Sequence, residues 1–366
     1  MGEIYINKDV ETRIIKSINH IEPDRVPIWE ALESPILYHH FAPNEKDFLK
    51  AASISCEALG IDMTYGCMFS PSPDEEYDTP NVHVSCQTHW SKHPQFSSVN
   101  DIINYKPRIV KRTQEFVDRY VESFYQLKEA YAPHTMYVSQ GAGFDFLGIA
   151  HGTGIGWDVF TTLLYEAPHL LEKIWDERVD YAVMRNSIYA EYQLAPVMQF
   201  CEDLAYKGGL LISPEHIRKY FIPRLKRTIQ PLKDANIKLI FHCDGNLMDI
   251  LDDLIEAGID GLNPIDPSAG MDIGFIKQKY GDKLILVGNV DGSRILPFGT
   301  PEEVREEVAS CIRKASPGGG HLIQCGCGEL MPDVPLENAL AYFDAVREFG
   351  KYPIKLYRIF GKYLRL

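Results

Sequence analysis

Three potential metal ligands follow one another where a short apolar run ends. The segment "KLIFHCD" places His242, Cys243 and Asp244 directly after residues that are typical of a buried strand. Side chains two apart on a strand project to the same side, so we expect His242 and Asp244 to converge and Cys243 to face the helices. A converging imidazole and carboxylate can bind a metal ion. The alternative is that His242 is a hydrogen-bonded core residue.

A pair of thiols lies at the end of another apolar run, in "IQCGCG". Zinc accepts imidazole, carboxylate and thiolate ligands, and a catalytic zinc keeps three protein ligands and one open position. His242, Asp244 and Cys327 meet that description. Two alternatives stay open: the cysteines are small residues in a glycine turn, or Cys243 or Cys325 replaces one of the three ligands.

Apolar runs and amphipathic segments alternate along the chain. The runs that we expect to form strands are 26–30, 61–66, 135–140, 196–203, 238–244, 260–265, 284–289 and 321–326. The segments that we expect to form helices are 45–59, 112–130, 168–190, 213–235, 248–257, 300–315 and 335–349. Ser213 and Thr300 each precede a proline and are predicted helix caps. This order predicts an α/β protein with a (β/α)₈ TIM barrel. A doubly wound sheet is the alternative, but no Gly-x-Gly-x-x-Gly follows the first run.

Residues 67–110 interrupt the alternation. They are rich in Pro, Ser, Asn and Asp and contain a possible strand pair, so we interpret them as a lid inserted over the barrel mouth. The residues before the first run form an N-terminal extension. We therefore predict a single domain over residues 1–366.

Polar and aromatic residues near the ends of the predicted strands are candidates for catalysis and substrate binding, because TIM-barrel sites gather there. Glu202 and Asp203 follow the fourth run and are candidates for a general acid or a fourth metal ligand; helix capping or a surface ion pair is the alternative. The candidate substrate-binding residues are Glu30, Tyr65, Phe144, Asn263 and Asn289. Aromatic residues are more often plain core.

The composition excludes some classes of function. A net charge of −14 argues against a nucleic-acid-binding protein, which needs clustered Lys and Arg. The N-terminal residues carry acids and no continuous apolar block, so we expect neither a secretory signal nor a membrane span. We predict a cytoplasmic enzyme, and a homodimer is one option for its assembly.

Four blocks of the chain, 22–28, 201–227, 242–267 and 319–353, together resemble the uroporphyrinogen decarboxylase superfamily. They are most similar to its corrinoid-dependent methyltransferase branch, and the resemblance implies the same barrel. The decarboxylases carry an arginine-bearing "RQAGR" segment after the first strand and an aspartate in "FSDI". This chain has "WEALESP" (29–35), with Glu30 and Glu33, and "FSPS" (69–72). Because glutamates repel a polycarboxylate, porphyrin decarboxylation is not expected.

The resemblance also bears on the metal. Thiol-methylating members of the branch take zinc ligands from a His-x-Cys-Gly motif and a Gly-Cys-Gly motif. His242 matches the histidine, Asp244 stands where the first cysteine would be, and Cys327 matches the second. A carboxylate in place of a thiolate makes the site harder, which favours an oxygen-bearing substrate.

The predicted function is zinc-dependent transfer of a methyl group from a small methylated compound to the cobalt of a corrinoid protein, as in O-demethylation in anaerobic one-carbon metabolism. A methoxylated substrate, aromatic or not, is the first choice. The corrinoid (cobalamin) arrives on a partner protein, since the sequence shows no Asp-x-His-x-x-Gly motif. The alternatives are methyl transfer from a corrinoid protein to a thiol or folate, decarboxylation of a small acid, and a non-catalytic binding barrel.

Overall fold

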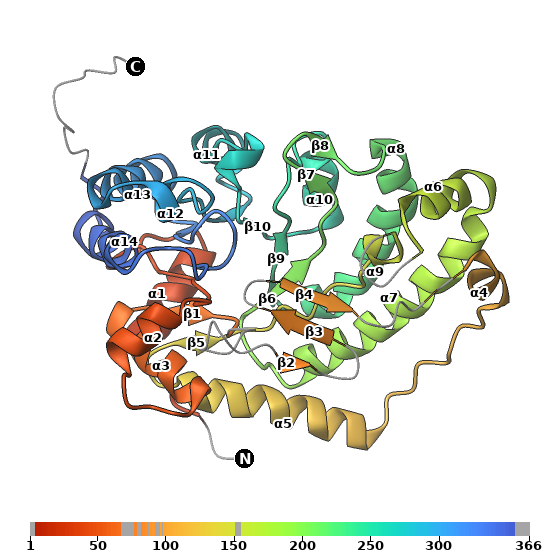
Figure 1. The fold of residues 1–366 in the computed structure, drawn as a ribbon, viewed down its shortest axis with the longest axis horizontal. Coiled ribbons are helices and arrows are strands. Elements are labelled where there is room, and N and C mark those ends of the chain that lie inside the picture. Colours follow the sequence, from red (N-terminus) through yellow and green to blue (C-terminus); the bar gives the residue numbers. More distant parts are fainter. Residues whose placement is uncertain are drawn as a thin grey trace. The chain divides into compact units, whose positions relative to one another are not determined.

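The computed structural model describes residues 4–66, 96, 98–150 and 155–355, and the backbone of three short strands within residues 77–91. The chain divides into two compact units. The first unit comprises residues 1–69, 128–137 and 261–366, and the second comprises residues 70–127 and 138–260. Figure 1 labels the elements of both units. The single-domain organisation stays a prediction.

The first unit holds short parallel strands that alternate with helices. Its elements are α1 (Lys8–Ile18), α2 (Pro35–Phe41), α3 (Phe48–Leu59), β1 (Met63–Thr64), β5 (Met136–Tyr137), β10 (Gly261–Asn263), η3 (Pro267–Ala269), α11 (Ile273–Tyr280), β11 (Ile285–Val287), α12 (Ile295–Phe298), α13 (Pro301–Ala315), β12 (His321–Leu322) and α14 (Leu336–Phe349). Figure 1 shows α13 and α14 packed side by side.

The strands of the first unit form one parallel series. β10 pairs with β11, and β11 pairs with β12. Ile28 bridges to Ile323, just after β12, and Trp29 bridges to Met63 in β1. β1 pairs with β5. Six parallel strand positions therefore follow one another in this unit.

The second unit contains the longest helices that the structure describes. Its elements are β2 (Tyr77–Asp78), β3 (Val82–Ser85), β4 (Thr88–Ser91), α4 (Val99–Asn104), η1 (Leu147–Ile149), α6 (Trp157–Glu166), α7 (Pro168–Glu191), β6 (Val197–Cys201), β7 (Ala205–Tyr206), β8 (Gly209–Leu210), α8 (Pro214–His216), η2 (Ile217–Phe221), α9 (Ile222–Asp234), β9 (Lys238–His242) and α10 (Leu251–Ala257). α5 (Gln114–Tyr131) begins in this unit and ends in the first. α7 and α9 pack along each other (Figure 1).

β6 and β9 are the two regular parallel strands of the second unit. They pair over five residues each, and Ser139 bridges to Met198 at the side of β6 away from β9. Over the described residues, six strand positions in the first unit and two in the second make eight. Each of the eight predicted runs contains one of them. The predicted α/β barrel class is confirmed, and α1 provides the N-terminal extension.

Several predicted helix signals are also confirmed. The side chain of Ser213 accepts a hydrogen bond from the backbone of His216. Thr300 and Glu303 form a reciprocal capping box with Pro301 at the first helical position. A strand pair exists in the predicted lid, where β3 and β4 are antiparallel. Most of residues 67–95 lie outside the described residues, so the lid stays a prediction. None of the described helices combines the length and the apolar character that crossing a membrane requires.

A buried carboxylate fixes the start of the first strand. Asp62, whose side chain is 1% exposed, accepts hydrogen bonds from Arg13 at 2.6 Å, Arg25 at 2.7 Å and the backbone N–H of Ile28 at 2.8 Å. Arg13 also pairs with Asp24 at 2.6 Å. The acidic and basic residues of "EPDRVPI" therefore join α1, the first strand and β1.

His321 at the start of β12 is fully buried. Its Nε2 lies 2.8 Å from the carbonyl oxygen of Gly288, which can only accept, so this nitrogen carries the proton. Nδ1 then accepts from the hydroxyl of Ser316 at 2.7 Å. Burial lowers the pKa of His321 to about 4, which keeps the ring neutral.

Replacing Asp62 with Asn should strongly destabilise the protein. The change leaves two guanidinium groups without their shared carboxylate, and breaking a buried ion pair in this way costs about 3–5 kcal/mol of the free energy of unfolding. Urea denaturation at pH 7 measures the loss. Asp282→Asn, at an exposed acid of the same unit, is the matched control, and equal losses in the two variants would contradict the role given to Asp62.

The stability should fall with acid because of His321. The unfolded ring takes up a proton near pH 6.5 and the folded ring only near pH 4, so the unfolded state binds more protons between these values. The stabilisation is complete above pH 6.5 and falls by roughly 3 kcal/mol as the pH drops to 4. Urea denaturation at four pH values in this window measures the slope. In His321→Gln, this part of the dependence of the free energy of unfolding on pH should be absent. An unchanged dependence would contradict the role given to His321.

Candidate metal centre and adjoining cavity

The pairing of β6 with β9 brings two polar segments together. The parallel register sets Cys201 opposite His242, and the backbone N–H of Glu202 donates to the carbonyl of His242 at 3.1 Å. Because parallel strands end at the same edge, the residues after each strand lie side by side. Gly245 is required here, since a Cβ at this position would lie 2.1 Å from the carbonyl carbon of Ala205.

Asp203, His242 and Asp244 form a cluster at this edge. One ligand atom from each lies within 4.8 Å of the others. Nε2 of His242 is 3.7 Å from Oδ1 of Asp244, and the backbone N–H of Asp244 donates to Oδ1 of Asp203 at 3.3 Å. The predicted convergence of His242 with Asp244 is therefore observed. Asp203, predicted as a general acid or a fourth ligand, joins them.

The donor set suits a small divalent cation. Ligand atoms around a tetrahedral zinc lie roughly 3.4 Å apart, given bonds of about 2.1 Å. The distance of 3.7 Å between His242 and Asp244 is close to this value, and rotation of the exposed Asp203 side chain can shorten its distances, which are at most 4.8 Å. One imidazole and two carboxylates make three protein ligands, which leaves one position open.

Cys243 points away from this cluster, as the strand alternation predicts. The residue is 2% exposed, and its Sγ lies 4.0 Å from the carbonyl oxygen of Ala205. Burial raises the pKa of this thiol to about 12. Since the thiolate is the form that binds metals, Cys243 is poorly suited to the role of ligand.

Cys327 belongs to the first unit, on the loop after β12. Its Sγ donates to the carbonyl of Glu329 at 3.0 Å and lies 3.8 Å from Sγ of Cys325. A side chain at position 292 would place Cβ 2.6 Å from Sγ of Cys327, so Gly292 makes room for this thiol. The assignment of Cys327 as a metal ligand stays a prediction.

Glu202 supports a loop of the second unit. Its two carboxylate oxygens accept hydrogen bonds from the backbone N–H groups of Phe146 at 2.9 Å and Leu147 at 3.1 Å. Burial raises the pKa of Glu202 to about 8 against the opposing effect of these donors. A carboxyl group of this kind holds its proton at neutral pH and can serve as an acid. Its catalytic role stays a prediction.

Glu30 is fully buried in the first unit. Its carboxyl group accepts from the backbone N–H of Cys325 at 3.0 Å, from the thiol of Cys325 at 3.3 Å and from the hydroxyl of Tyr342 at 3.0 Å. Burial raises the pKa of Glu30 to about 8. These contacts give the side chain a structural role, and its part in substrate binding stays a prediction.

The other candidate substrate residues also make internal contacts. The Tyr65 hydroxyl donates to the carbonyl of Gly328 at 2.6 Å. The Asn263 side chain bonds that of Gln324, and the Asn289 amide donates to the carbonyl of Ile265 at 3.0 Å. Phe144 stacks on Phe221 in the second unit, with ring centroids 5.4 Å apart. None of these contacts tests substrate binding.

A cavity of about 360 Å³ adjoins the cluster. Residues that follow β5 and β6 line it, and Asp203 is a member both of the cluster and of the cavity wall. Arg185 lies on α7 and borders the same cavity, and no sequence pattern predicts this, because the residue stands within a helix and far from any strand end. Its role is visible only in the structure, where Arg185 of α7 lies beside the residues that follow β5 and β6.

Comparisons with known proteins agree with this architecture. The chain is 28% identical over 192 residues to the uroporphyrinogen decarboxylase of Hydrogenovibrio crunogenus, and 29% identical over 191 residues to that of Methylococcus capsulatus. Each match covers 51% of this chain and 51% of the relative, so the chain spans about half the length of these curated relatives.

A solved structure described as a methyltransferase from Methanosarcina mazei has the same fold. It covers 93% of this chain and 98% of its own, with a TM-score of 0.68 and 18% sequence identity. The sequence model of the family "Uroporphyrinogen decarboxylase (URO-D)" matches residues 91–349, which is more than half of the chain. The chain therefore belongs to the uroporphyrinogen decarboxylase family.

Proposed function

We propose that the chain is a zinc-dependent methyltransferase that moves a methyl group from a small methoxylated compound to the cobalt of a separate corrinoid protein. The observation that carries the proposal is the cluster of Asp203, His242 and Asp244 beside a cavity at the ends of β6 and β9. The methyltransferase of Methanosarcina mazei shares the fold, which lends support to this branch of the family.

The reaction breaks the bond between the methyl carbon and the ether oxygen and forms a bond between that carbon and cobalt. The oxygen keeps the electron pair of the broken bond and needs a proton, and the cobalt(I) of the corrinoid protein supplies the electron pair of the new bond, which leaves methylcobalt(III). Zinc held by the cluster would act as a Lewis acid toward this oxygen. Oxygen ligands such as Asp203 and Asp244 make a harder site than thiolates, which favours an ether over a thioether substrate.

Glu202 is the candidate donor of the proton. It lines the cavity next to Asp203, and burial raises its pKa to about 8, so that its proton is present at neutral pH. Hydrogen bonds from Phe146 and Leu147 hold the carboxyl group in place. A positioned acid of this kind contributes about 10²–10⁴-fold to a rate.

Two sets of metal ligands compete. The spacing of the sequence and the family resemblance give His242, Asp244 and Cys327, while the local geometry favours Asp203 with His242 and Asp244. Both share the imidazole and one carboxylate. They differ in whether a carboxylate or a thiolate completes the site.

Porphyrin decarboxylation is the activity named for the curated relatives, and we do not propose it here. Glu30 and Glu33 stand where the decarboxylases carry arginines, and both are buried, at 0% and 2% exposed. Acidic side chains cannot pair with the carboxylates of a porphyrinogen. The decarboxylases carry an aspartate in "FSDI", and this chain has "FSPS" (69–72) at the corresponding place, which lies outside the described residues.

The corrinoid protein is proposed as a transient partner, since it must leave to deliver the methyl group. Three other functions predict different assay results. Methyl transfer to a thiol or folate would consume a methylated corrinoid protein. Decarboxylation of a small acid would proceed without any corrinoid protein. A non-catalytic barrel would bind its ligand and show no turnover.

Zinc binding should require the cluster. Each of three variants removes one ligand: Asp203→Asn, His242→Gln and Asp244→Asn. Each should weaken zinc affinity by at least about 100-fold, because losing a ligand costs more affinity than losing a residue that only hydrogen-bonds to a ligand. Metal content by mass spectrometry and calorimetric titration of the zinc-free protein measure the effect.

The matched control is Asp249→Asn, an exposed acid of the following loop. Cys327→Ala decides between the ligand sets: loss of zinc in this variant with retention in Asp203→Asn supports the thiolate set and overturns the carboxylate set. Undiminished zinc in all four ligand variants would rule out both.

Methyl transfer should depend on Glu202 according to the leaving group. Glu202→Gln should lower the rate of methyl-cobalt formation, followed by visible absorbance with a corrinoid protein, by about 10²–10⁴-fold for methanol or an alkyl methyl ether. The loss should shrink for methoxyarenes whose phenol is a strong acid, because their oxygen leaves without a proton. A loss of equal size for all substrates would mean that Glu202 only supports the loop.

A further inference from the structure

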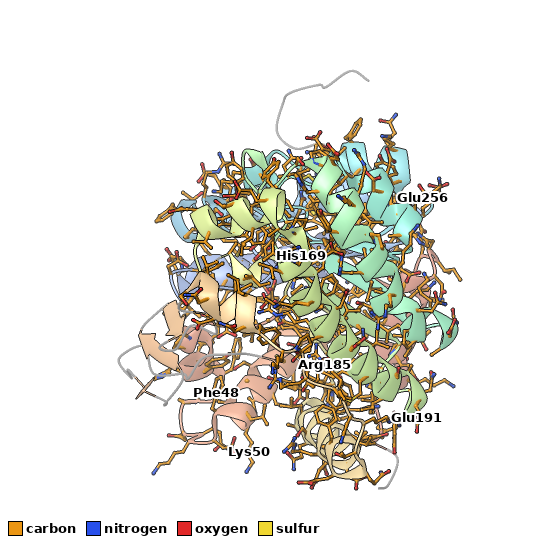
Figure 2. The ribbon with its side chains drawn as sticks, turned by 90° about the vertical axis from the view of Figure 1, so that its right-hand side faces the viewer. Phe48, Lys50, His169, Arg185, Glu191 and Glu256 are labelled. Atoms are coloured by element: carbon orange, nitrogen blue, oxygen red, sulfur yellow. The ribbon has the colours of Figure 1, made fainter. Side chains whose placement is uncertain are left out.

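Arg185 lies between two hollows of the second unit. The first is the cavity of about 360 Å³ described above, which we call the strand-end cavity; Gln140, Gly141, Arg185, Cys201, Glu202 and Asp203 are among its walls. The second, the outer hollow, measures about 720 Å³ and includes Phe116, Phe144, Tyr181 and Arg185. Figure 2 shows Arg185 along α7, between His169 near the start of the helix and Glu191 at its end.

Within the described part of the chain, the guanidinium of Arg185 has no acidic partner. Nη2 donates to the carbonyl of Gly143 at 2.9 Å, and Cζ lies 5.0 Å from the ring centroid of Tyr181. Nε is buried without a hydrogen-bond partner. No carboxylate of the described residues comes within ion-pair distance of it. Arg185 is half-buried, and a cation that is partly removed from water without a counter-charge is favourable ground for an anionic ligand.

Lys111 also lines the outer hollow, and Glu202 and Asp203 also line the strand-end cavity, while the remaining charged residues of the two linings, apart from Arg185, form ion pairs. Asp145 pairs with Arg178 at 2.8 Å, and Glu177 pairs with Arg108 at 2.9 Å. Two acids and two bases therefore cancel. Arg185 remains as a positive charge inside a chain whose net charge is −14.

The surroundings of Arg185 leave space for a ligand. Both hollows border the guanidinium, and Gly141 lies beside it, where a Cβ would come 3.6 Å from Nη1 of Arg185. A Cβ at position 143 would lie 2.7 Å from the carbonyl oxygen of Cys201, so the loop packs closely on the end of β6. The loop after β5 thus holds the guanidinium at the edge of the cavity.

We propose that Arg185 binds the carboxylate of the substrate, which makes the substrate class a methoxylated aromatic carboxylic acid. The planar guanidinium matches a carboxylate with two parallel hydrogen bonds. An aromatic ring between the carboxylate and the methoxy group would lie in the strand-end cavity, where Gly141 and Gly143 add no side chains to the wall. Asp203 and Arg185 line the same strand-end cavity, so one small molecule can reach both. The placement of its methoxy group rests on the proposed function; the binding of the carboxylate does not.

Benzoate and benzamide, equal in shape and different in charge, test the carboxylate site directly. Calorimetric titration of the full chain without a corrinoid protein, in zinc-free and zinc-loaded forms, should show benzoate binding at least about 10-fold more tightly than benzamide in both forms. Arg185→Gln should weaken benzoate binding by about 10–100-fold and leave benzamide unchanged. Arg185→Lys keeps the charge but loses the planar guanidinium, so its affinity for benzoate should lie between those of the unchanged protein and Arg185→Gln.

Arg227→Gln is the matched control, because Arg227 is an exposed arginine on α9 of the same unit, paired with Asp180. An equal loss of benzoate affinity in Arg227→Gln would show a general charge effect and overturn the proposal. So would equal affinities for benzoate and benzamide, or unchanged benzoate binding in Arg185→Gln. If circular dichroism shows that Arg185→Gln does not fold, Arg185→Lys decides by the same criteria.

Failure of the proposed function has a different signature. Benzoate binding that depends on Arg185, in a protein that forms no methyl-cobalt from 4-methoxybenzoate, keeps the carboxylate site and rejects methyl transfer. A second outcome would be equal turnover of 4-methoxybenzamide and 4-methoxybenzoate, with both rates unchanged in Arg185→Gln. That outcome would reject the role of Arg185 and keep methyl transfer.

Discussion

The parallel register between β6 and β9 is the constraint on which the candidate site depends. Setting Cys201 opposite His242 aligns the two strand ends, so that Asp203 and Asp244 must leave the sheet as neighbours. A shift by one residue would turn each side chain to the other face and would bury Asp203 or expose Cys243. Gly245 and the close approach of Ala205 hold this arrangement after the strands end.

Burial separates the acids of this chain into two groups with different chemistry. Asp62, Glu30 and Glu202 are buried, and each meets donors from the backbone or from arginine, cysteine or tyrosine. Such carboxyl groups are fixed in direction and are poor at rearranging around a metal ion. Asp203 and Asp244 are exposed, so their side chains can turn toward a cation. This is why the two exposed acids, and not the three buried ones, suit the role of ligands.

The sequence predicted the parts of the fold that depend on local pattern. Eight apolar runs identified the strand positions, and caps such as Ser213 and Thr300 marked helix starts, because both signals act within a few residues. The convergence of His242 with Asp244 follows from strand alternation alone. The pairing of Asp62 with Arg13 and the position of Arg185 depend on contacts across 49 and 42 residues, which no local pattern encodes. The ligand role of Cys327 depends in the same way on residues 85 positions apart in the sequence, 327 − 242.

The charges around the strand-end cavity limit what can occupy it. A porphyrinogen carries many carboxylates and needs several cations, whereas Arg185 is the one guanidinium among the described residues that line this cavity, beside the acids Asp145, Glu202 and Asp203. A ligand with one carboxylate gains the charge-assisted bonds at Arg185 and brings no surplus charge toward Asp203. A neutral ligand leaves Arg185 without a counter-charge, and a polyanion places further carboxylates against Glu202 and Asp203. The proposed ligand is therefore a small monoanion, in keeping with the buried Glu30 and Glu33 at positions where the porphyrin decarboxylases carry arginines.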